Sequence, residues 1–164
     1  MDVQELIDRL DLRPHPEGGF FRETYRSDES LAAELPGRYD GPRPLGTAIY
    51  FLITRDSFSA MHRLASDEVF HFYLGDPLVM LQLHPDGAGR EVLIGNDVAA
   101  GQVPQVIVPR GVWQGTRLLD GGRYALLGTT VAPGFDFKDF EFADRDQLLR
   151  HYPAHAERIG QLTR

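Results

Sequence analysis

Two side chains in the middle of the sequence form a pair that is able to move protons. His62 and Glu68 lie in the stretch 61–75, which is otherwise rich in apolar residues, and Gln114 ends a second motif at 109–114. An imidazole oriented by a carboxylate is a common general base. A carboxylate in an apolar cavity has a raised pKa unless a cation meets it, and protonated His62 is such a cation. We predict that His62 and Glu68 are a coupled acid–base pair, with Gln114 beside them.

Polar residues elsewhere are candidates for the same site. Tyr73 or Tyr25 would return the proton that His62 removes. Glu23 and Tyr25 share one face of the segment 20–26, where they either reach the rim of a pocket or form cross-strand pairs on the surface. Arg22 and Arg26 would bind a phosphate or a carboxylate bidentately, or would belong to a solvated face.

Aromatic residues supply possible walls for a pocket. Phe72 and Phe70 would line the cavity beside Glu68. Trp113 would stack on a planar ligand, although a single tryptophan is more often part of a core. Phe135 follows Pro133-Gly134 and either closes the pocket mouth or covers the sheet.

His71 is open to two interpretations. Strict alternation places Glu68, Phe70 and Phe72 on one face of a strand and His71 on the other. A bulge after Ser66-Asp67 would instead turn His71 into the pocket. It is therefore either a ligand-binding residue or a surface or interface histidine.

These residues need elements to position them, and from position 46 onward the chain reads as one strand after another. Segments rich in β-branched and aromatic residues alternate with Gly, Pro and Asp turns. No helical segments of the kind that join parallel strands lie between them. The spacing predicts a sandwich or barrel, with strands at 20–26, 47–54, 57–64, 68–74, 78–83, 91–94, 105–108, 114–118 and 123–131.

Helical periodicity occurs at the two ends only. Val3, Leu6, Ile7 and Leu10 form one apolar stripe, and the segment 144–164 has similar spacing, interrupted by a proline. A polar, proline- and glycine-rich loop at 27–45 separates the first strand from the rest. We expect residues 1–164 to form one domain.

Composition excludes several classes of protein. The chain has 164 residues, no cysteine and a formal net charge of −7. Disulfides, thiolate metal sites and a cysteine nucleophile are thus excluded. The acidic balance argues against nucleic acid as a partner. No apolar run has membrane-spanning length and the start is not a signal peptide, so we expect a cytoplasmic protein without a membrane partner.

The stretch 61–75 resembles the first motif of the cupin family. That motif has a His, a second His two residues later, a Glu and then a Gly. His62, Glu68 and Gly75 stand at the corresponding positions, and Leu64 replaces the second His. The resemblance implies an all-β double-stranded β-helix, or jelly-roll barrel, with short terminal helices.

The second cupin motif is matched by Pro109 and Gly111, with Gln114 in place of its His. More closely, nearly the whole chain resembles the cupin subfamily known as DUF985 (Cupin_5). This subfamily resemblance implies a dimer, and likeness to dTDP-sugar epimerases suggests a sugar- or nucleotide-like ligand. The phrases that carry it are His15-Pro16-Glu17-Gly18-Gly19, Glu23-Thr24-Tyr25-Arg26-Ser27, Ser66-Asp67-Glu68, His71-Phe72-Tyr73-Leu74-Gly75-Asp76-Pro77, Val108-Pro109-Arg110-Gly111-Val112-Trp113-Gln114 and Val131-Ala132-Pro133-Gly134-Phe135.

The cupin comparison also bears on metals. At the ligand positions only His62, Glu68 and Gln114 remain, Leu64 donates nothing, and Gln is a weak neutral oxygen donor. We favour a site without a cofactor, and keep a divalent metal held by these three residues as the alternative.

Three functions fit these observations. The first is a metal-independent isomerase, epimerase or lyase, in which His62 and Glu68 act on a small polar metabolite. The second is a metal-dependent cupin enzyme with a reduced ligand set. The third is a non-enzymatic module that binds or senses a small molecule. Because the segment 20–26 buries little on one side, we also expect a homodimer that pairs this strand between chains.

Overall fold

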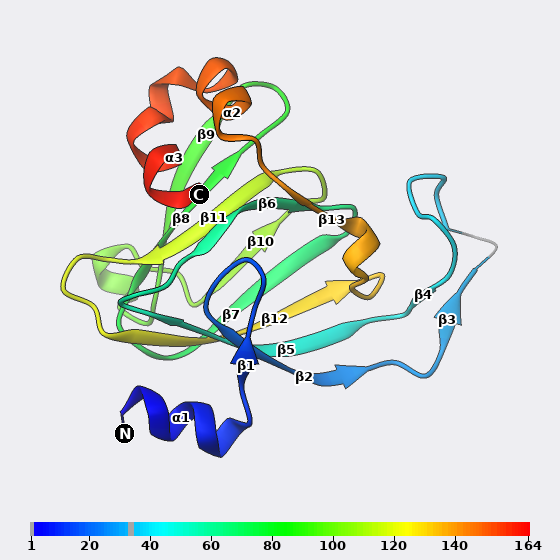
Figure 1. Cartoon of the computed structure of the whole chain (residues 1–164), viewed down its shortest axis with the longest axis horizontal. Coiled ribbons are helices and arrows are strands. Elements are labelled where there is room, and N and C mark those ends of the chain that lie inside the picture. The colour runs from blue at the N-terminus through cyan, green and yellow to red at the C-terminus, as the bar shows by residue number, and fades with distance from the viewer. Residues whose placement is uncertain (1, 33–34) are drawn as a thin grey trace.

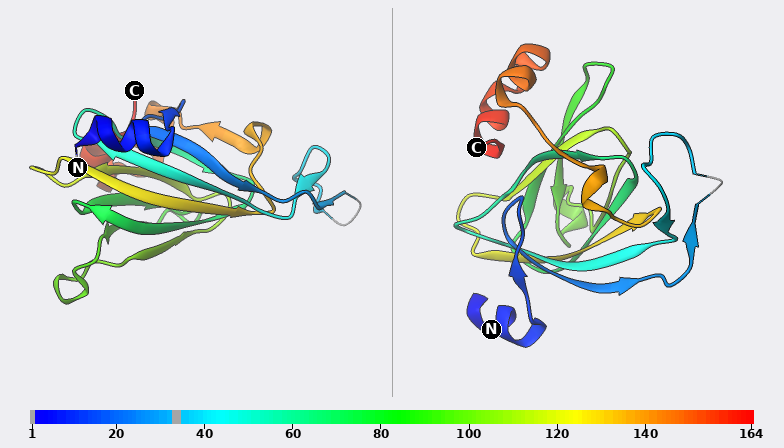
Figure 2. Two further views of the ribbon diagram at one scale, coloured as in Figure 1. Left: turned by 90° about the horizontal axis from the view of Figure 1, so that it is seen from below. Right: turned by 45° about the vertical axis from the view of Figure 1, so that its right-hand side comes forward.

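Two antiparallel sheets face each other and enclose the interior of the molecule (Figure 1). The computed structural model describes residues 2–32 and 35–164. One sheet has six strands in the order β1-β2-β5-β12-β7-β10, and the other has five in the order β13-β6-β11-β8-β9. Two views from other directions show the strands wrapping around this interior, with the helices outside it (Figure 2). The predicted barrel of antiparallel strands is confirmed.

The strands of the six-stranded sheet are β1 (Arg13–Pro14), β2 (Phe20–Arg26), β5 (Thr47–Thr54), β12 (Tyr124–Ala132), β7 (Asp67–Gly75) and β10 (Gln105–Val108). Those of the five-stranded sheet are β13 (Phe140–Phe142), β6 (Ser59–Leu64), β11 (Trp113–Leu118), β8 (Leu78–Leu83) and β9 (Gly89–Ile94). A small separate ladder joins β3 (Ser30–Leu31) to β4 (Arg43–Pro44). The helices are α1 (Val3–Leu10), α2 (Arg145–His151) and α3 (Ala156–Leu162), with 3₁₀ turns η1 (Val98–Ala100), η2 (Phe137–Asp139) and η3 (Pro153–His155).

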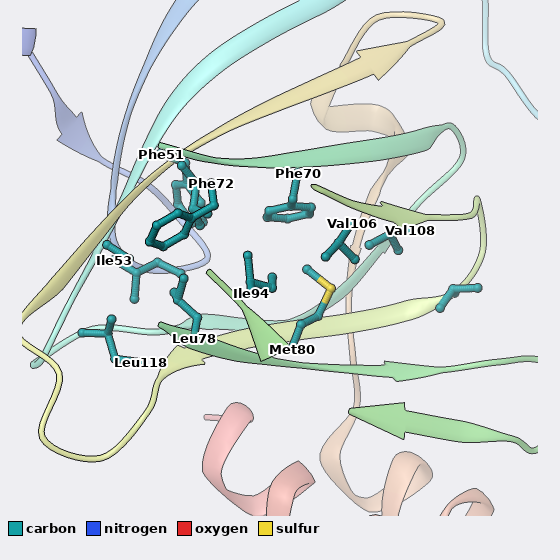
Figure 3. Close-up of a cluster of buried hydrophobic side chains, with 13 residues drawn as sticks. Phe51, Ile53, Phe70, Phe72, Leu78, Met80, Ile94, Val106, Val108 and Leu118 are labelled. Carbon is teal, nitrogen blue, oxygen red and sulfur yellow. The ribbon is translucent and has the colours of Figure 1, made fainter. Parts of the chain in front are cut away.

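The main core fills the space between the sheets (Figure 3). Alternation decides which side chains enter it: Phe51 and Ile53 of β5 point inward, whereas Leu52 between them packs outside. The outer side of Leu52 is covered by Leu6 of α1. On the opposite side, α2 and α3 cover the five-stranded sheet with Leu148, Ile159 and Leu162.

Side-chain caps fix where the predicted helices begin. The Asp2 carboxylate accepts from the Glu5 N–H at the start of α1, and Asp144 accepts from Gln147 at the start of α2. The tail divides into α2, η3 and α3 because Pro153 lies between the two helices. Helices at both ends were predicted, and the structure confirms them. In the described residues, no helix has the length and apolar character that crossing a bilayer requires.

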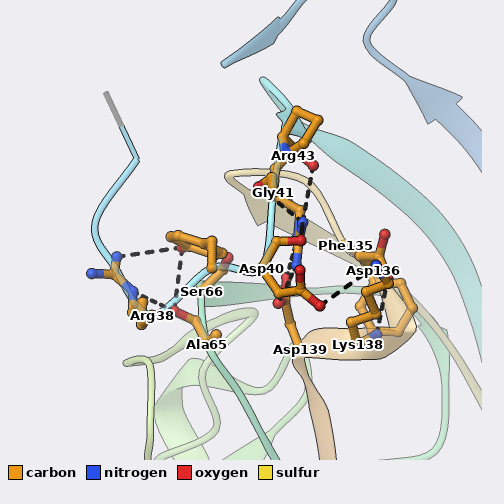
Figure 4. Close-up of polar contacts among 12 residues, drawn as sticks. Arg38, Asp40, Gly41, Arg43, Ala65, Ser66, Phe135, Asp136, Lys138 and Asp139 are labelled. Carbon is orange, nitrogen blue, oxygen red and sulfur yellow. Dashed lines mark hydrogen bonds and ion pairs between the residues drawn. The ribbon is translucent and has the colours of Figure 1, made fainter. Parts of the chain in front are cut away.

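The long loop before β5 is fastened to the segment that follows β12 (Figure 4). The Arg43 guanidinium donates two hydrogen bonds of 2.7 Å to the carboxylate of Asp139 in η2. Both side chains are buried. The short strands β3, β4 and β13 had no clear sequence signal because each depends on pairing with a distant segment.

Candidate functional site

A cavity of about 330 Å³ opens between the two sheets, at the end of the barrel where η2 lies. Its buried end holds His15, Glu17, His62 and Glu68, and its rim includes Glu23, Arg26 and Asp136. Six phenylalanines form most of the apolar wall, namely Phe21, Phe51, Phe70, Phe135, Phe137 and Phe140. Such a mixture of apolar walls with a few converging polar groups is typical of small-molecule sites.

Glu17 reaches the cavity from the turn between β1 and β2. The turn lies on β6, where the Ala60 N–H donates to the Glu17 carbonyl at 2.9 Å. Gly18 makes this approach possible because its φ is +117° and any Cβ there would collide with the Phe58 carbonyl oxygen. The glycine therefore brings Glu17 against His62 on β6.

The carboxyl of Glu17 contacts the imidazole of His62 directly. Glu17 Oε2 lies 3.3 Å from His62 Nε2, and Glu17 Oε1 accepts from Ser59 Oγ at 2.8 Å. His62 Nδ1 lies 2.7 Å from the Ala60 carbonyl oxygen, which only accepts, so Nδ1 carries a hydrogen. Nε2 therefore faces the Glu17 carboxyl and is the nitrogen that exchanges a proton.

Burial sets the proton affinities of this pair. It raises the pKa of Glu17 to about 8, against the opposing effects of the Ser59 hydrogen bond and the Arg164 charge. Burial lowers the pKa of His62, although the charge of Glu68 and the Ala60 carbonyl counteract this. Near neutral pH the favoured arrangement is a protonated carboxyl against a neutral imidazole.

His15 completes this end of the cavity as a neutral ring. Its Nδ1 accepts from the Glu17 N–H at 3.2 Å, and its ring meets the edge of Phe21 with 4.6 Å between centroids. Burial, and secondarily the charge of His62, lowers the pKa of His15 to about 4. It is a positioning group for the turn that carries Glu17.

Glu68 enters the cavity from β7, on the other sheet. Its Oε2 accepts from Gln114 Nε2 at 2.6 Å, and the Thr129 hydroxyl also donates to its carboxylate. Burial raises the pKa of Glu68 to about 7, and the charge of Glu17 adds to this increase. The charge of His62 and the hydrogen bonds from Gln114 and Thr129 lower the pKa of Glu68. The cavity thus presents two separate carboxyl groups, each able to hold a proton near neutral pH.

Comparison with known proteins agrees with this architecture. A family model described as "Cupin superfamily (DUF985)" matches residues 4–143. The chain belongs to this cupin family.

Other proteins are similar to this chain in sequence or in fold. This cupin is 31% identical over 158 residues to the uncharacterized protein YML079W of Saccharomyces cerevisiae, covering 91% of this chain and 79% of that one. A hypothetical protein from Leishmania major has 36% identity and a TM-score of 0.88, with 99% of each chain covered. Bacillus subtilis oxalate decarboxylase, whose Mn(II) centres have been studied, has a TM-score of 0.54 at 14% identity over 93% of this chain and 37% of its own, a likeness of fold alone.

The predicted pairing within the cupin site needs one correction. His62 and Glu68 both line the cavity, and Gln114 is buried beside Glu68, as expected. The carboxyl in contact with His62 is that of Glu17, however. Sequence reasoning did not assign Glu17 or His15 to the site, although both lie in the family phrase at 15–19. An acid held between a histidine and two glycines was the available signal.

Three predicted residues lie on the outer face of the six-stranded sheet instead of in the cavity. Tyr73 is 47% exposed and its ring lies over Gly128, so it is not placed to return a proton. Tyr25 is 56% exposed on β2. His71 follows the alternation outward, with Nε2 3.0 Å from Thr130 Oγ1. On β7 the pleat decides the positions of His71 and Tyr73, because no bulge reverses the faces of the strand before His71. On β2 a register shift between Glu23 and Tyr25 breaks the alternation, so Tyr25 does not share the cavity face with Glu23.

Two predicted aromatic residues belong to packing. Phe72 points into the barrel but lies in the main core, away from the cavity lining. Trp113 is on the outer side of β11, where it packs with the C-terminal helices, and the Arg63 guanidinium carbon lies 4.4 Å from its ring centroid. Neither is placed to contact a ligand in the cavity.

The rim agrees with the prediction for Glu23 and Phe135, which both line the cavity. Arg26 joins them: its Nε and Nη2 donate to the Glu23 carboxylate at 2.9 and 2.8 Å, and Nη2 also donates to the Phe135 carbonyl at 3.1 Å. Arg26 therefore links β2 to the segment that covers the cavity mouth.

The alternative of a divalent metal depends on the ligand atoms that His62, Glu68 and Gln114 offer. Gln114 directs its amide N–H₂ toward Glu68, which leaves its oxygen without a partner in the described residues, and Leu64 offers no donor. Across 2–32 and 35–164, no three His, Asp or Glu side chains are grouped so that they would hold a metal ion. His62, Glu68 and Gln114 as arranged do not fit a divalent cation.

Proposed function

We propose that this cupin binds a small polar metabolite, sugar- or nucleotide-like, in its barrel and acts as a metal-independent isomerase, epimerase or lyase. The observation that carries the proposal is the 3.3 Å contact between Glu17 and His62 inside a cavity that also presents Glu68. Acid–base groups facing a shared, largely apolar space are what proton abstraction next to a carbonyl requires.

The pair and Glu68 take separate roles in this mechanism. When Glu17 has lost its proton, His62 Nε2 accepts a proton from the substrate carbon, and Glu17 stabilises the resulting imidazolium. The electron pair of the broken C–H bond moves onto the substrate carbonyl, and protonated Glu68 donates to that oxygen or returns a proton to the carbon. Glu68 replaces the tyrosines first expected in this role.

The two carboxyls give the reaction a narrow pH range. The pair is active as a base above the Glu17 pKa of about 8, and Glu68 is active as an acid below its pKa of about 7. The product of the two active fractions is greatest between these values. A bell-shaped profile of kcat/KM with its maximum between about pH 7 and about pH 8 is expected.

Exchange with heavy water tests the proposal. The protein is incubated in D₂O with free and nucleotide-linked sugars, and mass spectrometry follows deuterium at carbon. Incorporation that depends on His62, and that His62→Gln abolishes, supports the mechanism. If a substrate binds in the cavity with no exchange in any of the sugars, the acid–base role is wrong.

The phenylalanine walls favour a second candidate, a binding or sensing module without chemistry. Tight binding of a co-purified ligand, identified by mass spectrometry of the denatured protein, would persist in His62→Ala if this candidate holds. Metal analysis of the purified protein tests the metal-dependent alternative: a stoichiometric divalent ion lost in Glu68→Gln would overturn metal independence.

A further inference from the structure

The buried end of the cavity carries more carboxyl groups than it has cations to match. Glu17 and Glu68 are both more than nine-tenths buried. In the described part of the chain, the groups within ion-pair distance of Glu17 are His15 and His62, and no Lys or Arg is that close to either carboxyl. The nearby Arg164 uses its Nη2 to donate to the Glu17 carbonyl oxygen instead.

Of the two carboxyl groups, Glu68 is the one that lacks a titratable partner. Glu17 shares a proton with His62, whereas both hydrogen-bond donors to Glu68, Gln114 and Thr129, are neutral. A buried carboxylate with neutral partners either holds a proton or attracts a cation. Because Glu68 lines the cavity, a ligand is in a position to supply that cation.

The walls beside Glu68 suit the same kind of ligand. Phe70 lies two residues further along β7 on the same face, and five more phenylalanines complete the wall. Aromatic faces attract organic cations, and more strongly where water is excluded. A phenylalanine wall makes no hydrogen bonds to hydroxyl groups, so the body of the ligand is apolar or planar where it meets the wall.

The rim disfavours anions. The rim carries two carboxylates, Glu23 and Asp136, and one guanidinium, that of Arg26. Glu23 already binds this guanidinium in a bidentate manner, and the charges of both carboxylates act on it. A phosphate passing this rim would meet a net negative charge.

We propose that the ligand of this cavity is a compact organic cation without phosphate, whose protonated amine pairs with Glu68 while its planar or apolar body lies against the phenylalanine wall. This rests on the small-molecule binding part of the proposed function; toward such a ligand Glu68 is the pairing carboxylate and not the acid, so the acid–base role stays with Glu17 and His62. It keeps the small polar metabolite of that function but replaces the sugar- or nucleotide-like class by an amine-bearing compound of roughly single- or double-ring size, in line with a cavity of about 330 Å³.

Three probes of equal size test the charge preference: 2-phenylethylamine, 2-phenylethanol and phenylacetate, each titrated by calorimetry and by thermal shift. The amine is expected to bind at least about tenfold more tightly than the alcohol, with phenylacetate the weakest. In Glu68→Gln the amine and the alcohol should bind within about twofold of each other, because the charge preference resides in that carboxylate. Glu29→Gln, an exposed change outside the cavity lining, is the control and should keep the preference.

The outcomes separate this inference from the proposed function. Equal or tighter binding of the alcohol or phenylacetate by the unaltered protein overturns the cation while leaving a small-molecule site intact. Retention of the amine preference in Glu68→Gln also overturns it, and alcohol binding by that variant shows that the cavity is still formed. If none of the three binds, the inference is wrong, and the D₂O exchange experiment with sugars decides the proposed function separately.

Discussion

Glu17 and His62 are tied to each other by a single proton, and Glu68 stands apart from them. The Nδ1 contact to Ala60 fixes which imidazole nitrogen faces the carboxyl. Gln114 fixes Glu68 from behind at 2.6 Å. These fixed orientations mean that a substitution by glutamine, which has a similar volume and can accept hydrogen bonds, removes the proton chemistry while largely retaining the packing.

The first prediction concerns His62→Gln and Glu68→Gln. Each should change the free energy of unfolding by no more than about 1 kcal/mol at pH 7, since it removes a site and leaves no cavity. Each should weaken ligand binding or abolish turnover. Urea unfolding and ligand titration measure the two effects separately. Unfolding of either variant, with unaltered affinity per folded molecule, would show that the residue has a structural role.

The second prediction concerns the pH dependence of stability. A carboxyl whose folded pKa is raised stabilises the protein below its unfolded pKa and loses this contribution as pH rises through the folded value. Glu68 and Glu17, at about 7 and about 8, should therefore lower the free energy of unfolding as pH rises toward 8. His15 and His62, whose pKa values are lowered, act in the opposite sense below about 6.5 only.

Stability should thus decline between about pH 6.5 and about pH 8, with a slope of up to about 1.4 kcal/mol per pH unit for each carboxyl. Urea unfolding at closely spaced pH values measures this slope. Glu17→Gln should flatten it, and the control Glu29→Gln should not. A slope that Glu17→Gln leaves unchanged would mean that Glu17 is ionised throughout this range.

Among the elements, the turn between β1 and β2 has the greatest influence on the site. It joins two strands of the six-stranded sheet, lies on β6 of the other sheet through the Ala60–Glu17 backbone bond, and delivers Glu17 and His15 to the cavity. The Arg26 bonds to Glu23 and Phe135 hold the opposite rim in a comparable manner. The site is therefore assembled by contacts between elements that are distant in sequence.

The third prediction tests this turn through Gly18→Ala. The added Cβ would collide with the Phe58 carbonyl at a φ of +117°, so the turn must move away from β6. A loss of about 1–3 kcal/mol in the free energy of unfolding, together with weaker ligand binding, is expected. Gly121→Ala is the matched control, because Gly121 also has a positive φ of +88° but has open space around it. Equal losses from both variants would show that the collision is unimportant.

At the scale of the whole molecule, most of β2 forms an uncovered edge of the six-stranded sheet. On one side it pairs with β5 along most of its length, and on the other β1 covers only Phe20 and Phe21. Within the described ranges, the rest of that edge, from Arg22 to Arg26, has no strand partner. A free edge of this kind favours pairing with another chain.

The fourth prediction is a homodimer formed through β2. Sedimentation velocity at micromolar concentration should show two chains per particle. Tyr25→Lys, at this exposed strand, should shift the equilibrium toward monomer, whereas Phe142→Lys, exposed on β13 of the other sheet, should not. A monomer, or a dimer that only Phe142→Lys disrupts, would contradict this assembly.

The sequence by itself determined the barrel, its terminal helices and the inward direction of His62 and Glu68. Strand alternation, turn residues and cap residues are local properties, so they can be predicted from the sequence alone. The same alternation already favoured an outward His71. Only the tertiary structure decided which carboxyl contacts His62, because Glu17 meets it through a turn whose path depends on Gly18 fitting against β6. It likewise placed Tyr25 outside the cavity, since a register shift between Glu23 and Tyr25 breaks the alternation on β2, and it packed Trp113 with the C-terminal helices.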